Sequence, residues 1–191
     1  MSTIVDELDL RLGERLRAER EARGWSLTDL AQRSGVSRAM INKIERAESS
    51  PTASLLGRLS GAFGLTLSEL LARTEAARVG RLLRAADQPL WRDPETSYVR
   101  RQIAPVPGSG LPLELVQVQL PASAAISFPA AAYTFIQQLI WVLKGRLTFV
   151  DGTVTHELGP GDCLELGAPA DRTFRNPTRA TCEYLIAVLR Q

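Results

Sequence analysis

The spacing of hydrophobic residues changes once along this 191-residue chain, close to Pro94. Before that point apolar residues recur at helical spacing, whereas after it short alternating runs are separated by turn residues. A helical half followed by a β half is typical of two domains, and the chain is long enough for both. We therefore predict a helical domain over residues 1–73, a partly helical linker over 74–93 and a β domain over 94–191.

Capping residues divide the first half into five predicted helices. Ser26, Ser37 and Thr52 are suited to be N-caps, because a hydroxyl oxygen can accept a hydrogen bond from the free N–H groups of the first turn. Gly24 and Gly64 follow predicted helices, as glycine commonly does. The expected helices are Asp9–Arg23, Ser26–Arg33, Arg38–Arg46, Thr52–Phe63 and Ser68–Arg73, with a further one over Glu75–Ala86 in the linker.

Seven short runs in the second half predict β-strands. Asp151-Gly152 between two alternating runs is a strong hairpin signal. Many short strands at regular spacing favour a sandwich or a barrel. The expected strands are Ser97–Ala104, Leu113–Leu120, Gln138–Leu143, Arg146–Val150, Thr153–Leu158, Asp162–Leu166 and Cys182–Leu189.

The segment Leu27–Arg46 carries the main functional signal. Two short predicted helices flank a turn at Gly35, a residue suited to a positive φ. Five small or apolar residues are spaced to bury one face of both helices: Leu30, Ala31, Val36, Ile41 and Ile44. The exposed face of the second helix is then formed by Arg38, Ala39, Asn42, Lys43 and Arg46.

This exposed face is suited to the major groove of DNA. Arginine and asparagine form paired hydrogen bonds with guanine and adenine edges. Ser37, at the helix start, can bond a phosphate, which a helix N-terminus also favours. Residues 33–46 include four basic residues and one acid. We therefore predict a double-stranded DNA partner, in preference to the alternative of an ordinary helical bundle with a solvated charged face.

Four motifs of this domain are shared with a known family: Leu27–Ala31, Gly35–Arg38, Ile41–Arg46 and Ser50–Thr52. Over Leu10–Ala72 the chain resembles the XRE-type family of phage-repressor-like regulators. The resemblance implies an all-α five-helix bundle whose third helix enters the major groove. It also implies the contacts of the recognition helix, in which a phosphate would face Arg46 and bases would face Arg38, Ala39, Asn42 and Lys43.

The sequence departs from this family at two positions. Leu27 stands where the family often has glutamine near a phosphate, and Ala47 replaces the usual glycine after the recognition helix. Neither change is expected to alter the fold, but the contacts with phosphates can differ from those of the family.

The second half also contains recognisable motifs: Ile140–Leu147, Leu158–Cys163, Pro169–Asp171 and Phe174–Pro177. Over Tyr98–Arg190 it resembles the cupin superfamily, which implies an all-β fold, the double-stranded β-helix or jelly-roll barrel. Many cupins hold a divalent metal through three histidines and a glutamate. At the matching positions this chain has Ala131–Thr134, Gln138 and Arg172. Because none of these is a usual metal ligand, we expect no metal and no cofactor.

An enzyme is the least favoured interpretation. His156 is the single histidine, and neither paired carboxylates nor a nucleophile with its base occur in the β half. We therefore expect no catalytic residues. Tyr133, Gln138 and Arg172 are instead candidates to bind a small organic anion, because arginine pairs well with carboxylate and phosphate.

Two interpretations of the barrel stay open. It either senses such an effector and controls DNA binding, or it is packed shut, with Arg172 at its rim, and serves only for dimerisation. In both, we expect a homodimer that binds an inverted-repeat operator, since dimers read two half-sites.

Composition excludes a few classes. No apolar run approaches the roughly 18 residues that span a bilayer. Met1–Asp9 lacks the basic-then-apolar pattern of a signal peptide, so we expect a cytoplasmic protein. Cys163 and Cys182 are too few for a disulfide framework and are expected to be buried thiols, with a redox-sensing pair as the less favoured alternative. The net charge of +2 does not by itself demand a nucleic-acid partner.

Overall fold

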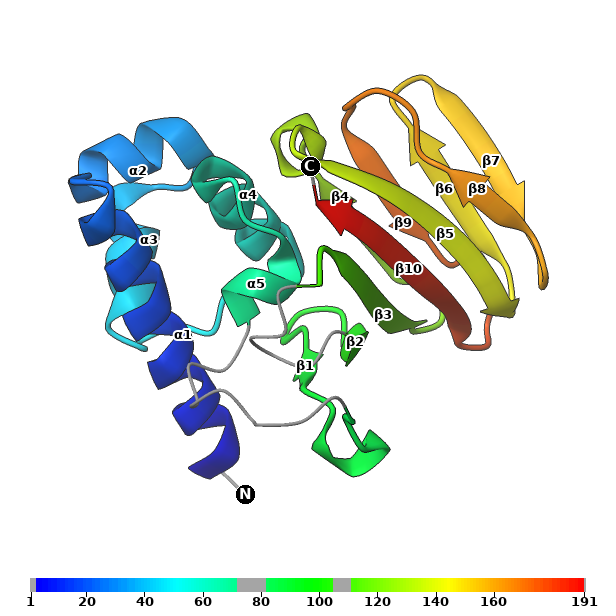
Figure 1. The fold of residues 1–191 in the computed structure, drawn as a ribbon, viewed down its shortest axis with the longest axis horizontal. Coiled ribbons are helices and arrows are strands. Elements are labelled where there is room, and N and C mark those ends of the chain that lie inside the picture. The colour runs from blue at the N-terminus through cyan, green and yellow to red at the C-terminus, as the bar shows by residue number, and fades with distance from the viewer. Residues whose placement is uncertain (1–2, 72–81, 105–110, 191) are drawn as a thin grey trace.

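The computed structural model describes residues 3–71, 82–104 and 111–190, which form a helical domain and a β domain side by side (Figure 1). The helices are α1 (Thr3–Ala22), α2 (Leu27–Ser34), α3 (Arg38–Glu45), α4 (Ala53–Phe63), α5 (Leu67–Leu71), and the short 3-10 helices η1 (Ala85–Asp87) and η2 (Ala130–Tyr133). The strands are β1 (Leu90–Arg92), β2 (Val99–Ala104), β3 (Leu113–Leu120), β4 (Ala125–Phe128), β5 (Ile136–Lys144), β6 (Leu147–Asp151), β7 (Val154–Leu158), β8 (Cys163–Glu165), β9 (Arg172–Arg175) and β10 (Cys182–Arg190).

The helical domain contains the five expected helices, with changed bounds at both ends. The first helix begins at Thr3 instead of Asp9, and the fifth covers Leu67–Leu71. Most of the predicted linker helix Glu75–Ala86 lies outside the described residues, and its end overlaps η1. Among the residues that the structure describes, no helix is long and apolar enough to cross a membrane.

Three helices end in the same hydrogen-bonded turn, and one of these turns is strained. α1 and α4 end at Gly24 and Gly64, which have φ of 67° and 68°. After α3 the same position is Ala47, with φ of 54°. Its N–H donates to Ile44 O (2.9 Å) and the next N–H, of Glu48, donates to Lys43 O (2.8 Å). The helix therefore ends in a Schellman motif with alanine at the position that favours glycine.

The β domain is a sandwich of two antiparallel sheets. One has the strand order β1-β2-β3-β10-β5-β8 and the other has the order β4-β9-β6-β7. This arrangement agrees with the expected cupin-like jelly roll. All seven expected strands are present, but β1, β4 and β9 were not predicted. They are three or four residues long, too short for a clear alternating pattern. β1 lies within the predicted linker and pairs with β2, so it belongs to the larger sheet.

The core between the sheets is aromatic. The rings of Phe174 and Tyr184 are stacked with centroids 5.7 Å apart, and Phe149 meets Phe174 edge-on at 4.8 Å. Cys182 is buried as expected, and burial raises the pKa of its thiol to about 11. Cys163 is exposed, contrary to the sequence prediction, because β8 is an edge strand and places this side chain outward.

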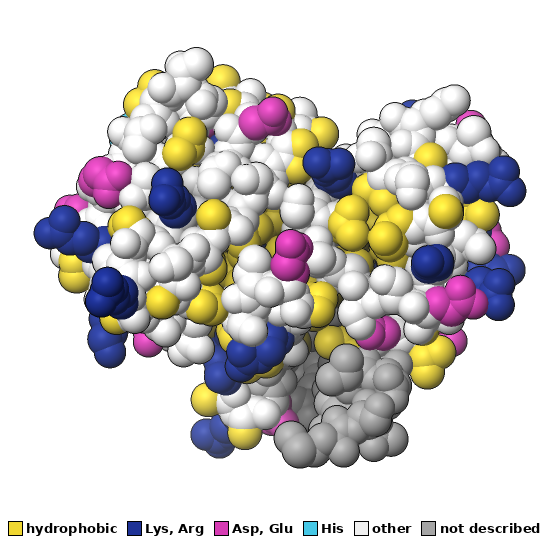
Figure 2. All heavy atoms as spheres, turned by 180° about the vertical axis from the view of Figure 1, so that it is seen from behind, with side chains coloured by type: hydrophobic (Ala, Val, Ile, Leu, Met, Phe, Trp, Pro, Cys, Tyr) yellow, Lys and Arg dark blue, Asp and Glu magenta, His cyan; other side chains and the backbone are white. Residues whose placement is uncertain are grey.

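Helix α4 packs directly against the barrel end formed by η2 and β4 (Figure 1). Two glycines make this close approach feasible. A β-carbon at Gly57 would lie 2.3 Å from Cδ1 of Phe128, and one at Gly61 would lie 3.0 Å from the backbone nitrogen of Ala132. Hydrophobic side chains line this junction in the view from behind (Figure 2).

Polar contacts also join the two domains. The backbone N–H of Ala53, at the start of α4, donates to Asp93 Oδ1 at 2.8 Å. At α5, Thr66 Oγ1 donates to Glu114 Oε1 at 2.8 Å. The two domains are therefore joined by packing and hydrogen bonds as well as by the linker.

The strained turn after α3 gives a stability prediction. Replacing Ala47 with glycine relieves a left-handed backbone that costs alanine roughly 1–2 kcal/mol. Against this, the greater conformational freedom of glycine in the unfolded chain lowers the stability of the folded state by roughly 0.4–1 kcal/mol. We therefore expect Ala47→Gly to raise the free energy of unfolding by about 0.5–1 kcal/mol, measured by urea denaturation.

The matched control is Ala18→Gly, at an exposed position within α1. Glycine there should lower stability by about 1 kcal/mol. An Ala47→Gly variant no more stable than the wild type would contradict the strain argument.

Candidate DNA-binding helix and barrel cavity

Local hydrogen bonds build the helix-turn-helix. Ser26 Oγ accepts from Asp29 N–H (3.2 Å) and the Asp29 carboxylate accepts from Ser26 N–H (2.8 Å), which forms a capping box at the start of α2. Hydrogen bonds from the Ser26 side chain and backbone lower the pKa of Asp29. Gly35 ends α2 with φ of 66°, and Ser37 Oγ accepts from Met40 N–H (3.2 Å) to begin α3.

The two helices share one buried apolar face. Leu30, Val36, Ile41 and Ile44 are each at most 3% exposed. Their burial fixes the rotation of α3 about its axis, and hence the side chains that it presents to solvent.

The outward face of α3 holds the residues predicted to contact DNA. Asn42 is half-buried, and the others are exposed: Ser37, Arg38, Ala39, Lys43 and Arg46. Several Lys and Arg side chains lie at the outer end of the helical domain in Figure 2. Ser37 Oγ uses a lone pair for its capping bond, so its O–H remains able to donate to a phosphate.

An ion pair holds α3 against α1. Arg20 bonds Glu45 through two nitrogens, at 2.7 and 2.8 Å, and donates a third bond to Trp25 O at 2.9 Å. The hydrogen bond that Arg20 donates to Glu45 raises the pKa of Arg20. This pairing neutralises the single acid that the sequence places among the basic residues of the recognition segment.

Arg46 already has an acidic neighbour. Its guanidinium lies 2.9 Å from Glu48, and the two side chains are 65% and 44% exposed. Because an exposed ion pair contributes little stability, this guanidinium can exchange Glu48 for a phosphate at small cost.

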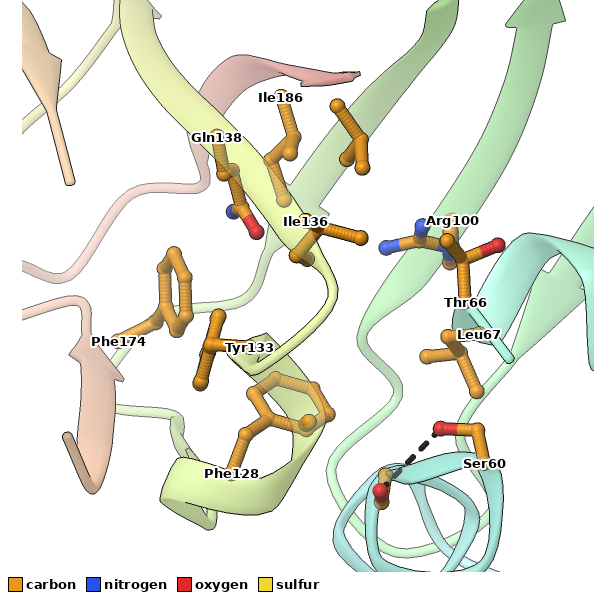
Figure 3. A pocket seen from close by; sticks show the side chains of 13 residues that line it. Ser60, Thr66, Leu67, Arg100, Phe128, Tyr133, Ile136, Gln138, Phe174 and Ile186 are labelled. Carbon is orange, nitrogen blue, oxygen red and sulfur yellow. Dashed lines mark hydrogen bonds between the residues drawn. The ribbon is translucent and has the colours of Figure 1, made fainter. Parts of the chain in front are cut away.

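A second site lies where the helical domain meets the barrel. A cavity of about 50 Å³ is lined by α4, α5 and inward-facing residues of the barrel (Figure 3). Two of the three residues predicted to hold an organic anion, Tyr133 and Gln138, line it. They are 6% and 8% exposed.

The third of these residues, Arg172, does not line the cavity and is not at a rim. It is 1% exposed, and its Nε donates to Asp151 at 2.8 Å. Its Nη2 donates to the carbonyl oxygens of Gly167 (3.0 Å) and Ala168 (2.9 Å), and its guanidinium lies 4.3 Å from the ring centroid of Tyr133. Its charge and hydrogen bonds are therefore satisfied within the protein. The match to the cupin metal positions could not reveal these partners.

The cation that does line the cavity is Arg100 of β2. It is 8% exposed, its Nη2 donates to Ser68 Oγ at 2.9 Å, and its buried Nε has no hydrogen-bond partner among the residues that the structure describes. Sequence reasoning missed it, because Val99 and Arg100 are both buried and break the alternation expected of β2. The sequence signal that could have indicated this residue is a charged side chain within the predicted strand Ser97–Ala104.

The cupin metal positions offer no ligand set. Ala131 and Thr134 are exposed at η2, outside the cavity. Within residues 3–71, 82–104 and 111–190, no group of three or more His, Cys, Asp or Glu side chains could hold a metal ion.

Comparisons with known proteins agree with this architecture. The family model described as HTH_3, helix-turn-helix, matches residues 16–70. The chain is 29% identical over 182 residues to the HTH-type transcriptional regulator SutR of Escherichia coli (strain K12), covering 94% of this chain and 95% of that protein. It is 27% identical over 92 residues to the HTH-type transcriptional regulator SinR of Bacillus subtilis (strain 168), covering 48% and 83%.

The fold of the whole chain has a counterpart among solved structures. An HTH_3 family transcriptional regulator from Vibrio cholerae superposes with a TM-score of 0.80 at 21% identity, covering 97% of this chain and 98% of that one. Residues 16–70 thus match an HTH_3 helix-turn-helix domain, and the whole chain has the fold of an HTH_3 family transcriptional regulator.

Proposed function

We propose that this protein is a sequence-specific DNA-binding regulator that acts as a homodimer and responds to a small molecule held beside its barrel. The observation that carries the DNA-binding part is the outward face of α3. Arg38, Asn42 and Lys43 lie on it, while the acid of the same segment, Glu45, is paired away with Arg20.

Each α3 side chain receives a role from its chemistry and position. Arg38 and Asn42 read bases, because their side chains can form paired hydrogen bonds with guanine and adenine. Arg46, at the end of the helix, and the Ser37 hydroxyl, at its start, contact phosphates. Together they place the helix in the groove and let it distinguish sequence.

The outer face of the larger sheet supports dimerisation. Trp141 of β5 lies opposite Leu185 of β10, and Leu139 lies opposite Ala187. Trp141 and Leu139 are 46% and 38% exposed. Contiguous apolar surface of this kind marks an interaction site. We infer that a second copy of the chain covers it, because an inverted repeat needs two recognition helices.

Contact between the domains favours ligand control over a barrel that serves only for dimerisation. The cavity touches both domains, so a molecule within it contacts the helices that position α3 as well as the barrel. A dimerisation module has no need of such a cavity.

Replacing Arg38, at the start of α3, and Arg46, which follows its end, should affect DNA binding in different ways. Arg38→Ala should cost about 1–3 kcal/mol of binding free energy on the preferred sequence and relax the preference at one base pair. Arg46→Ala should weaken binding to all sequences alike and reduce the salt slope by about one. Fluorescence anisotropy with preferred and random duplexes over a range of salt concentrations measures both effects.

Arg58, exposed on α4, supplies the control, and Arg58→Ala should leave specificity unchanged. If Arg38→Ala weakens preferred and random DNA equally, Arg38 does not read a base.

The sheet face gives a prediction about assembly. Trp141→Glu places a charge in the apolar patch and should convert a dimer into a monomer in sedimentation experiments. Losing the second recognition helix should lower affinity for a two-half-site duplex by about 100-fold or more. Val154→Glu, a 53% exposed apolar residue on the other sheet, is the matched control and should stay dimeric. A Trp141→Glu protein that sediments like the wild type would show that this face is not the interface.

A further inference from the structure

We infer that the cavity between the helical domain and the barrel is the effector site, and that it takes a small aliphatic monocarboxylate held by Arg100. This inference rests on the proposed function, since an effector site presupposes ligand control of DNA binding. It moves the anion anchor from Arg172, which the protein itself satisfies, to a residue of another strand.

The cavity is built by both domains. Ser60, Thr66 and Leu67 come from the α4–α5 segment of the helical domain, whereas Ile136, Gln138 and others come from the barrel. Figure 3 shows the Arg100 side chain extending into the space between these two groups. A ligand here would contact both domains at once.

Arg100 is an unmatched buried cation. Only 8% of it is exposed, and within the described part of the chain its hydrogen-bond partner is a neutral hydroxyl, Ser68 Oγ, with no carboxylate in ion-pair range. A buried charge without a counter-ion is costly, and a guanidinium with an unused N–H is a strong donor to a carboxylate. An anion in the cavity would supply both the missing charge and the missing acceptor.

The remaining lining selects a monoanion with an apolar tail. Burial raises the pKa of Tyr133, so its hydroxyl stays protonated and can donate a hydrogen bond. Gln138 adds an amide, and apolar surface comes from Phe128, Ile136 and Ile186. Among the described residues, the lining provides one cation, neutral donors and apolar walls, which match a single carboxylate on a short hydrocarbon.

The volume limits the size of the ligand. One water needs roughly 10–15 Å³ of such space, so a cavity of about 50 Å³ holds about three to five non-hydrogen groups. Acetate and propionate fall within this range.

The route from the cavity to DNA runs through α4. This helix packs against the barrel on one side and against α2 on the other, and α2 packs against α3. A ligand that tightens or loosens the contact of α4 with the barrel therefore shifts the frame that holds the recognition helix.

The first test uses the wild-type full-length protein and propionate as the probe. Sodium propionate is titrated against sodium chloride at matched ionic strength, with methyl-labelled isoleucines observed by NMR. Ile136 and Ile186 should shift saturably, whereas the core residue Ile41 of α3 should move less. Propionamide, which is neutral, should bind at least tenfold more weakly. Absence of saturable shifts up to about 50 mM, a generous limit for so small a ligand, would overturn the inference.

The second test uses variants. Arg100→Gln should weaken propionate about tenfold to a hundredfold, the range for a hydrogen bond to a charged group, and Arg100→Lys should restore part of the affinity. The matched control is Arg101→Gln, the neighbouring residue of the same strand, which does not line the cavity and should bind normally. Equal propionate affinity in wild type and Arg100→Gln would place the site elsewhere.

A third measurement separates this inference from the function beneath it. Affinity for a preferred DNA duplex is compared with and without saturating propionate. A change of about 5-fold or more in the wild type that is lost in Arg100→Gln supports the effector site. Propionate binding at Arg100 with unchanged DNA affinity overturns the effector role and leaves DNA binding intact. Absence of any sequence preference in DNA binding would instead overturn the proposed function.

Discussion

The close packing of α4 against one end of the barrel is the constraint on which the rest of the molecule depends. Glycine at positions 57 and 61 permits this packing, because a β-carbon at position 57 would collide with the ring of Phe128 and one at position 61 would lie tightly against the backbone of η2. The carboxylate of Asp93 completes the contact by accepting a hydrogen bond from the first turn of α4. A helical domain tied to the barrel in this way is held at a defined position, and the cavity beside α4 is a direct product of the junction.

The outward face of α3 is also positioned by packing and by polar contacts. Burial of Leu30, Ile41 and Ile44 fixes the orientation of α3, and the pair of Arg20 with Glu45 fixes its far end. The same ion pair keeps the carboxylate of Glu45 away from Arg38 and Lys43 on the outward face. The proposed DNA recognition therefore depends on packing and on an ion pair that lie away from the outward face of α3.

The sequence could predict what local chemistry determines. Ser26, Ser37 and Thr52 cap helices where hydroxyl groups were expected to do so, and the residues predicted for the outer face of α3 lie there. It could not predict what only tertiary contact determines. Asp151, which pairs with Arg172, is 21 residues away in the chain. No motif indicates that Nε of Arg100 lacks a hydrogen-bond partner among the described residues.

The central claim is that α3 reads DNA sequence, and selection from a pool of random duplexes with the full-length protein tests it most directly. The account predicts enrichment of an inverted repeat whose half-sites lie about one helical turn, roughly 34 Å, or a multiple of it apart. It also predicts that a protein with both Arg38 and Asn42 replaced by alanine enriches no sequence. A pool that stays random with the wild-type protein, or enrichment that survives the double replacement, would contradict it.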